Sequence, residues 1–355
     1  MNVLLLTSHA IAERDDLDMF TRMGVPTYSI GGAYDEVPFE GKRPAIPNVR
    51  RYWDLEEATN NQRHRLSVLY GDPGPNIDWA KARLAPEVID WADTIIVHHF
   101  PEAWIGGQWD AIRDKRVIWR TCGQSDPRLE AVMSRYREQG LQVVRYSPKE
   151  KEAFTRWGAF AGEDVLIRFG KDPDEWTGWH GESANGGPWV GNITQHMKQR
   201  GDACGYWEWE NLTRGLHAWP AGPGSEAIAG AGSLDYEDMR RYLRECRVYL
   251  YTGTRPASYT LGLIEAMMTG TPVVAVGYGF QPRDLWEGND IVRGPRCETP
   301  QDARDLLVEL LANPKQAEVR GARGRARAIE LFGLDGVMAQ WADFLGLHAP
   351  LEAAA

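Results

Sequence analysis

The sequence predicts an α/β protein of two domains, each built on a parallel sheet with helices on both faces. The chain has 355 residues, which is enough for two domains that each bury a core. Short apolar runs alternate with amphipathic stretches over residues 1–168, and the alternation begins again over 188–335. Between them, residues 169–187 are rich in Gly, Asp and Trp and have no periodicity, so we expect a linker there. Residues 336–348 are expected to form a trailing helix.

The composition indicates a globular protein that works in a reducing compartment. Hydrophobic residues make up 43% of the chain and charged residues 25%. The net charge of −10 argues against unaided binding along duplex DNA. The cysteines are far apart and suggest neither a disulfide framework nor a zinc site. No stretch approaches the roughly 20 apolar residues of a membrane span, and residues 1–7 lack the pattern of a signal peptide. We therefore expect a cytoplasmic protein.

The first series predicts strands at residues 3–7, 24–30, 93–99, 117–119, 142–146 and 165–168, and helices at 15–23, 79–91, 103–114, 128–139 and 149–157. The pattern weakens between residues 31 and 76, where Pro and Gly are frequent. Within 42–65, six Lys or Arg stand against three acids, with Tyr52 and Trp53 among them. This stretch is either a solvated loop and helix or a docking surface for an anionic partner.

The second series predicts strands at 188–191, 216–219, 226–229, 248–251 and 272–276, and helices at 205–214, 236–246, 260–268, 301–311, 319–332 and 336–345. Residues 248–276 give strand, helix and strand in about 30 residues, which is a parallel crossover unit. In open parallel sheets, ligands bind at the carboxyl ends of the strands. The turn Pro256–Leu261 lies at such an end, and its N–H groups open a helix that could hold a phosphate.

Residues 256–275 read Pro-Ala-Ser-Tyr-Thr-Leu-Gly-Leu-Ile-Glu-Ala-Met-Met-Thr-Gly-Thr-Pro-Val-Val-Ala. This stretch resembles the donor-site signature of retaining GT-B glycosyltransferases, glycosyltransferase family 4 in particular. The resemblance implies two Rossmann-like domains that face each other across a cleft, with a last helix that crosses back onto the first domain. It also implies a nucleotide-diphosphate sugar donor of UDP or GDP type, transfer with retention, and neither a bound metal nor another cofactor.

The family signature carries two glutamates, and only one is present here. The second glutamate matches Glu265, which the resemblance implies to hold the ribose hydroxyls of the donor. The first falls on Ala257, so either Ser258 or Tyr259 contacts the sugar, or the donor is smaller or differently oriented. The main-chain N–H groups of Ser258, Tyr259, Thr260 and Leu261 are the implied phosphate donors. The family has glycine where Thr260 stands, so this contact requires an ordinary helical φ at Thr260.

The stretch Val190–Gly201 takes the place of the family's diphosphate-binding segment. The arginine of that segment falls on Asn192. Its lysine corresponds to Lys198 or Arg200, and we prefer Arg200 because it directly precedes Gly201, as the family lysine precedes a glycine. A solvated loop cation is the alternative.

In the first domain, His98 and His99 end a predicted strand, where the resemblance places a histidine that contacts the donor sugar near the reacting centre. A side chain that titrates near neutrality suits proton transfer or hydrogen bonding, so these two are the catalytic candidates. His9 and Gln124 lie at neighbouring strand ends and are candidates on the acceptor side.

Other motifs are interpreted as structural. Asp172-Pro-Asp174 spells the Asp-x-Asp of metal-dependent glycosyltransferases, but no apolar strand presents it, so we interpret it as a turn. Gly230-Ala-Gly232 lacks the third glycine of a dinucleotide fingerprint. Two other functions stay open: a sugar-nucleotide epimerase on the same fold, and a catalytically degenerate nucleotide-sugar-binding protein. The acceptor is unknown: a small molecule, a glycan, or a nucleic acid or other polyanion.

Overall fold

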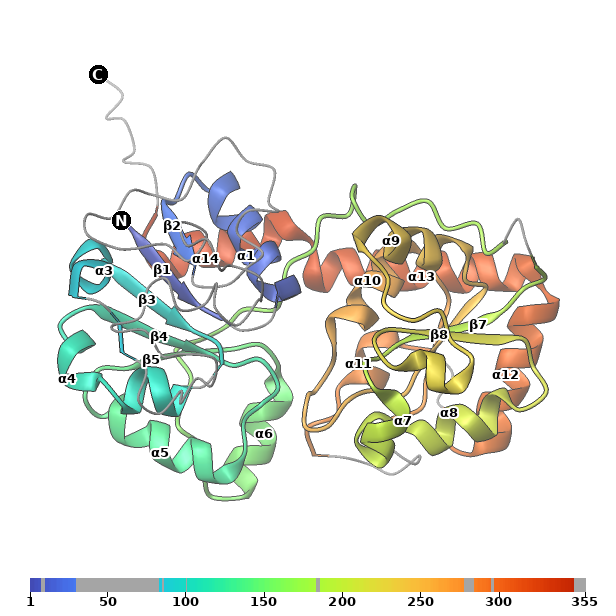
Figure 1. The fold of residues 1–355 in the computed structure, drawn as a ribbon, viewed down its shortest axis with the longest axis horizontal. Coiled ribbons are helices and arrows are strands. Elements are labelled where there is room, and N and C mark those ends of the chain that lie inside the picture. Colours follow the sequence, from blue (N-terminus) through green and yellow to red (C-terminus); the bar gives the residue numbers. More distant parts are fainter. Residues whose placement is uncertain are drawn as a thin grey trace, which may run out of the picture. The chain divides into compact units, whose positions relative to one another are not determined.

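The computed structural model of the chain describes residues 1–7, 10–29, 83–84, 86–99, 101–182, 186–277, 284–294 and 297–347. These divide into two compact units (Figure 1). The first contains Met1–Gly170 and the chain from Val337 onward, and the second contains Lys171–Gly336. The sequence placed the corresponding limits at residues 168, 188 and 335.

A parallel six-stranded sheet forms the centre of the first unit in the described part of the chain, in the order β2-β1-β3-β4-β5-β6. Its strands are β1 Val3–Leu6, β2 Thr27–Ser29, β3 Thr94–Val97, β4 Arg116–Arg120, β5 Gln142–Arg145 and β6 Val165–Leu166. The central strands are apolar and buried on both faces, as expected of a parallel sheet covered by helices. The register pairs Leu4 with Ile95 and Ile95 with Val117.

The helices of the first unit are α1 Ala10–Arg22, α3 Pro86–Trp91, η3 Glu102–Gly106, α4 Trp109–Ile112, α5 Pro127–Arg137, α6 Pro148–Arg156 and most of α14 Leu334–Leu345. Helix α5 begins at Pro127 because Asp126 accepts a hydrogen bond from the Leu129 N–H, and Pro127 needs no donor at that position. The single helix predicted over 103–114 is wrong, because the chain forms a π-helical turn, η3, followed by the short α4.

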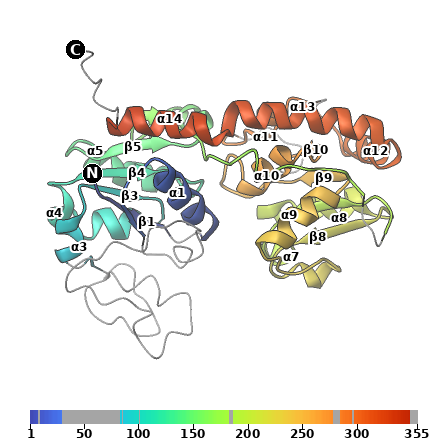
Figure 2. The ribbon, with the colours of Figure 1, turned by 90° about the horizontal axis from the view of Figure 1, so that it is seen from above.

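The last helix packs on the first unit, as the resemblance implied (Figures 1 and 2). The Trp341 side chain is completely buried, and its ring meets the ring of Phe20 edge-on at 5.7 Å between centroids. Arg116 Nη2 donates to the carbonyl of Phe344 over 2.7 Å. The first and the last described residues therefore lie in the same unit.

The second unit has a parallel four-stranded sheet among its described residues, in the order β10-β9-β7-β8. The strands are β7 Val190–Ile193, β8 Ala218–Ala221, β9 Val248–Tyr251 and β10 Val273–Ala275. Gly191 pairs with Tyr249, and Val274 pairs with Leu250. Because β7 and β9 are neighbours, the loops that follow them leave the same edge of the sheet side by side.

The helices of the second unit are α7 Met197–Arg200, η4 Gly201–Cys204, α8 Tyr206–Thr213, η5 Ser225–Ile228, α9 Tyr236–Glu245, α10 Leu261–Thr269, α11 Gly288–Val292, α12 Pro300–Ala312 and α13 Pro314–Phe332. Helices α8 and α12 share one buried cluster with the strands, through Trp209, Leu307 and Val248. Helix α10 packs against α9 and α13 (Figure 2). None of the described helices in either unit is long and apolar enough to cross a membrane.

Two local predictions in this unit need correction. Residues 226–229, predicted as a strand, form the 3₁₀ turn η5, because Gly224 and Ala229 on its two sides adopt left-handed conformations with φ of 80° and 57°. Helix α13 begins at Pro314 rather than at Val319, because the Asn313 side chain accepts from the Gln316 N–H.

The segment that follows Gly170 is tied to the second unit. The Lys171 N–H donates to the Phe332 carbonyl over 2.8 Å, and the Trp179 indole N–H donates to the Cys246 carbonyl over 2.7 Å. The Trp176 side chain is buried, with its ring 5.7 Å from that of Tyr236. The first part of the predicted linker therefore contributes to the packing of this unit.

Candidate functional site

The turn between β9 and α10 lies at the carboxyl edge of the second sheet. Helix α10 begins at Leu261, and Thr260 precedes it with φ −118° and ψ 160°. The helical φ expected at Thr260 is therefore wrong, because the residue is extended. Any L-residue adopts this conformation, so the chain reaches the helix here without the family's glycine. Gly253, by contrast, has φ 77°, and a Cβ there would lie 2.3 Å from the Trp286 ring. Only glycine fits at that point of the turn.

The stretch after β7 touches this turn. The Thr252 hydroxyl donates to the Cys204 carbonyl, and the Arg255 N–H donates to the Ala203 carbonyl, each over 2.7 Å. These carbonyls belong to η4, which directly follows α7. The structure thus brings together two predicted parts of the donor site, the β9–α10 turn and the segment that carries Lys198 and Arg200. Both cations have exposed side chains on α7.

Asn192 occupies the position that the resemblance assigns to an arginine, and it ties two strands together. Its Nδ2 donates to the Leu250 carbonyl of β9 over 2.7 Å, and its main-chain N–H donates to the Tyr242 hydroxyl over 3.0 Å. The side chain is buried, and its Oδ1 has no hydrogen-bond partner among the described residues. The amide therefore holds the carboxyl end of β7 against β9, and it cannot supply the positive charge of an arginine.

Glu265 lies inside the second unit in a buried ion pair. Its Oε1 is 2.6 Å from Lys171 Nζ, and both side chains are 1% exposed. Lys171 Nζ also lies 5.1 Å from the centre of the Trp176 ring. Buried charges of opposite sign satisfy each other in this way. The ribose role of Glu265 stays a prediction, and any ligand that reaches the carboxylate shares it with Lys171.

The other predicted donor residues differ in exposure. Tyr259 is buried with its ring 5.3 Å from that of Phe332, and Ser258 is buried, with its carbonyl accepting from the Glu287 N–H over 3.0 Å. Ala257 and Leu261 are half-buried. The side chains of Ser258 and Tyr259 thus belong to the packing of the turn, and the role of its N–H groups in phosphate binding stays a prediction.

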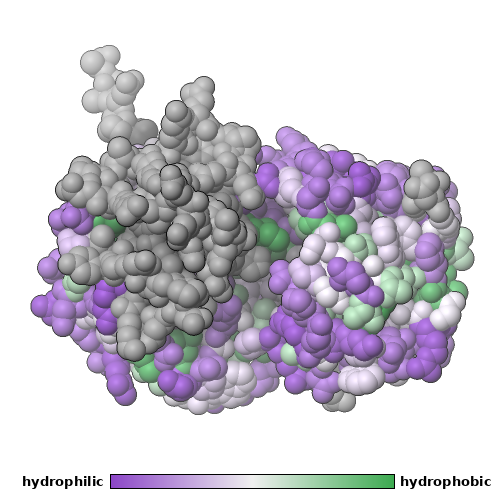
Figure 3. All heavy atoms as spheres, in the orientation of Figure 1, coloured by the Kyte–Doolittle hydropathy of each residue, from purple (hydrophilic) through white to green (hydrophobic). Residues whose placement is uncertain are grey.

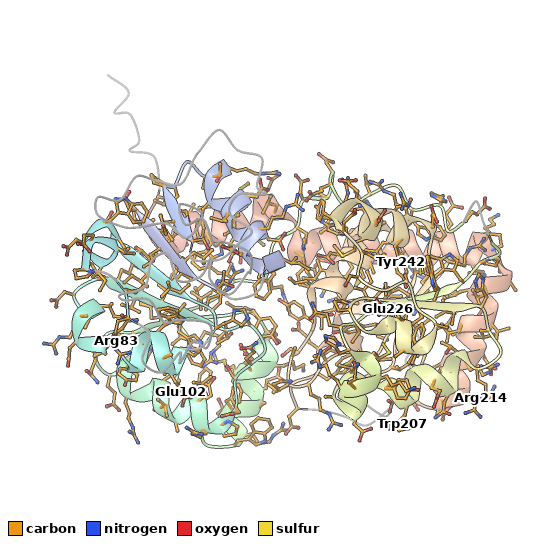
Figure 4. The ribbon with its side chains drawn as sticks, viewed as in Figure 1. Arg83, Glu102, Trp207, Arg214, Glu226 and Tyr242 are labelled. Atoms are coloured by element: carbon orange, nitrogen blue, oxygen red, sulfur yellow. The ribbon has the colours of Figure 1, made fainter. Side chains whose placement is uncertain are left out.

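The first unit contains a cavity of about 390 Å³ at the carboxyl ends of β3 and β4. Its lining includes His98, Glu102, Trp119, Gln124, Ser125 and Arg128. It therefore brings together two residues that the sequence singled out separately, His98 and Gln124. Glu102 comes from η3, near the beginning of α5 (Figure 4). The volume of the cavity falls within the range of roughly 300–1,000 Å³ for small-molecule sites.

His98 is held by a charged network beneath this cavity. Its Nε2 lies 3.1 Å from Asp16 Oδ2, and Asp16 Oδ1 lies 2.5 Å from Arg120 Nη1. Burial raises the pKa of Asp16, but the charge of Arg120 and the close contact with His98 outweigh this and hold the pKa below its ordinary value. Burial lowers the pKa of His98, although Asp16 opposes the shift, so the imidazole is neutral at pH 7.

The negative charge of Asp16, 3.1 Å from Nε2 of His98, favours the proton on that nitrogen, although the two groups do not have the geometry of a hydrogen bond, and Nδ1 is then the acceptor of the ring. Nδ1 is buried and has no hydrogen-bond partner in the described parts of the chain. His99 differs, because it is absent from the cavity lining and its Nδ1 lies 3.2 Å from the Thr7 hydroxyl. The structure thus distinguishes two histidines that the sequence could not.

Sequence reasoning missed several buried ionisable groups in the first unit. Arg145 makes a two-pronged ion pair with Glu130, over 2.6 and 2.7 Å. Glu150 accepts from the Thr121 hydroxyl over 2.5 Å, and burial raises its pKa to about 8 against the effect of Arg145. Burial also raises the pKa of Cys122 to about 12. The sequence contained one signal that could have revealed these groups, namely an arginine at the end of each of the apolar strands β4 and β5.

His9 and the basic segment 42–65 lie outside the described residues. Asp172-Pro-Asp174 forms a turn, as predicted, in which the Asp174 N–H donates to Asp172 Oδ1 over 2.8 Å. Gly230 is required by packing, because a Cβ there would lie 2.3 Å from the Pro220 carbonyl oxygen. Within the described residues, no three His, Cys, Asp or Glu side chains gather into a metal site.

Two Rossmann-like units on parallel sheets, with the last helix returned to the first, make this a GT-B fold. Solved structures with the same fold cover nearly the whole chain. HepE from Anabaena in complex with UDP-glucose matches with a TM-score of 0.65 at 15% identity, over 98% of this chain and 100% of that one. Sucrose-phosphate synthase from Thermosynechococcus elongatus matches with a TM-score of 0.63 at 14% identity, over 98% of each chain. At such low identity, these matches establish the fold alone.

Sequence comparison points to the second unit. Residues 190–343 match a family model described as glycosyl transferase-like. The chain is also similar to an MMP alpha-(1->4)-mannosyltransferase of Mycolicibacterium hassiacum, at 31% identity over 137 residues. That match covers 34% of this chain and about a third, 31%, of the curated relative.

Proposed function

We propose that the protein is a glycosyltransferase that moves a sugar from a UDP- or GDP-type nucleotide-diphosphate sugar to an acceptor hydroxyl. One observation carries the proposal: the family match over 190–343 contains the β9–α10 turn and the α7–η4 segment, which touch at the carboxyl edge of the sheet. Ligands of open parallel sheets bind at this edge. The similarity to a mannosyltransferase and to a sugar-nucleotide complex of HepE supports the same class of reaction.

The donor would be held by the second unit. The first turn of α10 offers main-chain N–H groups to the diphosphate, and Lys198 and Arg200 on α7 offer positive charge. Because Asn192 supplies no charge, these two exposed cations would carry the electrostatic part of diphosphate binding. Glu265 would bind the ribose hydroxyls while it keeps its ion pair with Lys171.

The acceptor would occupy the cavity of the first unit beside His98 and Gln124. We infer transfer with retention from the resemblance to the retaining family. The acceptor oxygen bonds to the anomeric carbon on the face that the diphosphate leaves, and a phosphate oxygen takes the acceptor proton. Nδ1 of His98 is buried but has no partner among the described residues, so an acceptor hydroxyl that reached it would donate to it and be oriented by it. The mechanism requires no metal ion.

A nucleotide-sugar-binding protein without transferase activity is the second candidate. Three observations support this candidate. Glu265 is already paired with Lys171, Asn192 carries no charge, and Ala257 has no carboxylate. All three features weaken the donor site relative to the family pattern.

The test incubates the full chain with UDP- and GDP-sugars, with and without a panel of sugar and polyol acceptors, in buffer containing EDTA. Acceptor-dependent release of nucleoside diphosphate, together with a product of retained anomeric configuration, supports the transferase. Conversion of the donor without acceptor indicates an epimerase or a hydrolase. Saturable nucleotide-sugar binding with neither reaction selects the second candidate, and no binding at all contradicts both.

A further inference from the structure

The second unit contains another cavity, of about 420 Å³, bounded by α10, β10, α12, α13 and the end of α11. Three arginines line it: Arg293, Arg320 and Arg323. Apolar side chains, among them Met267, Leu306 and Val319, form much of the rest of the wall, which also includes Glu309 and Gln316. The cavity thus combines positive charge with an apolar surface.

This cavity lies at the opposite edge of the sheet from the proposed donor site. Its lining includes Val273, the first residue of β10, so it opens at the amino ends of the strands. The β9–α10 turn follows the carboxyl end of β9, and β9 and β10 are parallel. A ligand in this cavity would therefore occupy a site separate from the proposed donor site.

The guanidinium group of Arg320 is fixed in position. Its Nε donates to the Val273 carbonyl over 2.9 Å. It also packs against Gly294, where an added Cβ would lie 2.4 Å from Nη2. Its two Nη groups make no hydrogen bond to any described residue. A guanidinium group that is held at Nε and has free Nη donors can make two parallel hydrogen bonds to the oxygens of an anionic ligand such as a phosphate.

The positive charge around Arg320 is only partly balanced by the described residues. None of the three arginines makes a salt bridge there, and Glu309 is the acidic residue of the lining. Burial lowers the pKa of Arg320, Cys297 and Glu309 oppose this shift, and the charge of Arg323 adds a smaller effect that lowers the pKa. An anion bound among the three side chains would remove this repulsion.

We infer that this cavity binds a small phosphate monoester, with the phosphate on Arg320 and Arg323 and an apolar body against the wall around Met267 and Leu306. Phosphate fits the fork of the guanidinium group and carries enough charge to balance two arginines. Arg293, at the end of α11, would complete the ring of donors. The ligand would bridge α11 and α13 and so act on the second unit from outside the proposed reaction site.

Three probes test this on the full chain by calorimetry: phenyl phosphate, inorganic phosphate and phenol. Phenyl phosphate should bind more tightly than either of the others, because it alone satisfies both the arginines and the apolar wall. Arg323→Met should weaken its binding about tenfold, the loss expected for one charge-assisted contact. Arg293→Gly should act in the same direction at a position whose φ of 45° suits glycine.

Lys315→Met is the matched control, because it removes the same charge from α13 at a position outside the cavity. It should leave the affinity for phenyl phosphate unchanged. Equal weakening by Lys315→Met, or unchanged binding in both arginine variants, would overturn the inference. Thermal melting of each variant establishes that it folds. The result does not depend on transferase activity, because none of these variants alters the β9–α10 turn.

Discussion

Glu265 and Lys171 show how far a single residue pair departs from what the motif suggests. The motif around Glu265 indicates a ligand-binding carboxylate, yet the side chain is buried with an ammonium group 94 positions away in sequence. An ion pair of this kind need not add much stability as a whole, but the loss of one partner leaves an uncompensated buried charge. A substitution at Glu265 therefore acts on folding as well as on nucleotide binding.

We expect Glu265→Ala to lower the free energy of unfolding by about 3–5 kcal/mol, because Lys171 stays buried without a partner. The double variant Glu265→Ala with Lys171→Met should recover most of this loss. Urea unfolding of the single and double variants measures both values. A single variant within about 1 kcal/mol of wild type would show that the pair is not buried as described.

The two adjacent histidines have different surroundings, so their substitutions should differ. If transferase activity is detected, His98→Asn should lower kcat/KM at least about tenfold, because a hydrogen bond at the cavity is lost. His99→Asn should have a smaller effect, since His99 contacts Thr7 rather than the cavity. Steady-state kinetics of the two variants measure both effects. A larger loss of kcat/KM in His99→Asn would refute the assignment of His98 as the histidine that serves the cavity.

Glu150 gives the first unit a specific dependence on pH. Its pKa in the folded protein, about 8, is above the ordinary 4.5, so the folded state holds an extra proton between these values. Stability from this residue is therefore greatest at low pH and falls as pH rises toward 8. Glu150→Gln, which never ionises, should gain roughly 3 kcal/mol relative to wild type between pH 5 and pH 8. Chemical unfolding at both pH values measures the difference, and a constant difference would contradict the shifted pKa.

At the scale of elements, helix α14 matters most, because it belongs to the first unit although it follows the second in sequence. Trp341 anchors it between Phe20 and Arg120, whose guanidinium carbon lies 5.3 Å from the centre of the Trp341 ring. The sequence predicted a helix at this position from its periodicity. Its docking on the first unit was implied only by the family resemblance.

Trp341→Ala should destabilise the first unit by about 3–5 kcal/mol, the usual range for removal of a buried tryptophan. Trp207→Ala is the control, because Trp207 is 53% exposed at the surface of the second unit (Figure 4). Most of the surface that this unit presents in Figure 3 is hydrophilic. Hydrogen exchange should show faster opening of β1 and β4 in Trp341→Ala. Equal losses in the two variants would mean that α14 does not support the first unit.

The strands of both sheets were predictable because buried parallel strands are short, continuous apolar runs bounded by turn residues. The strand Val248–Tyr251 and the strands beside it could be predicted from this apolar pattern alone. The errors arose where local geometry decides the structure. The turn at Ser225–Ile228 depends on left-handed conformations at Gly224 and Ala229, and helix α13 begins at a cap, Asn313, that precedes its periodic part.

At the scale of the whole molecule, the GT-B fold was predictable from two alternating series and one motif. The candidate site was only partly predictable from the sequence. Its position at strand ends follows from topology, and the cavity confirms that His98 and Gln124 lie together. The pairing of Asp16 with His98 and of Lys171 with Glu265 could not be predicted, because it depends on contacts between residues far apart in sequence.

The central claim is that the second unit binds a nucleotide-diphosphate sugar at the β9–α10 turn. The most direct test is the melting temperature of the full chain with UDP- and GDP-sugars, with NAD as a control, for wild type and for Arg200→Met. A ligand that binds only the folded state raises the melting temperature. We predict a saturable rise of several degrees with at least one nucleotide-sugar, reduced in Arg200→Met and absent with NAD. No rise with any nucleotide-sugar, or an equal rise with NAD, would contradict the claim.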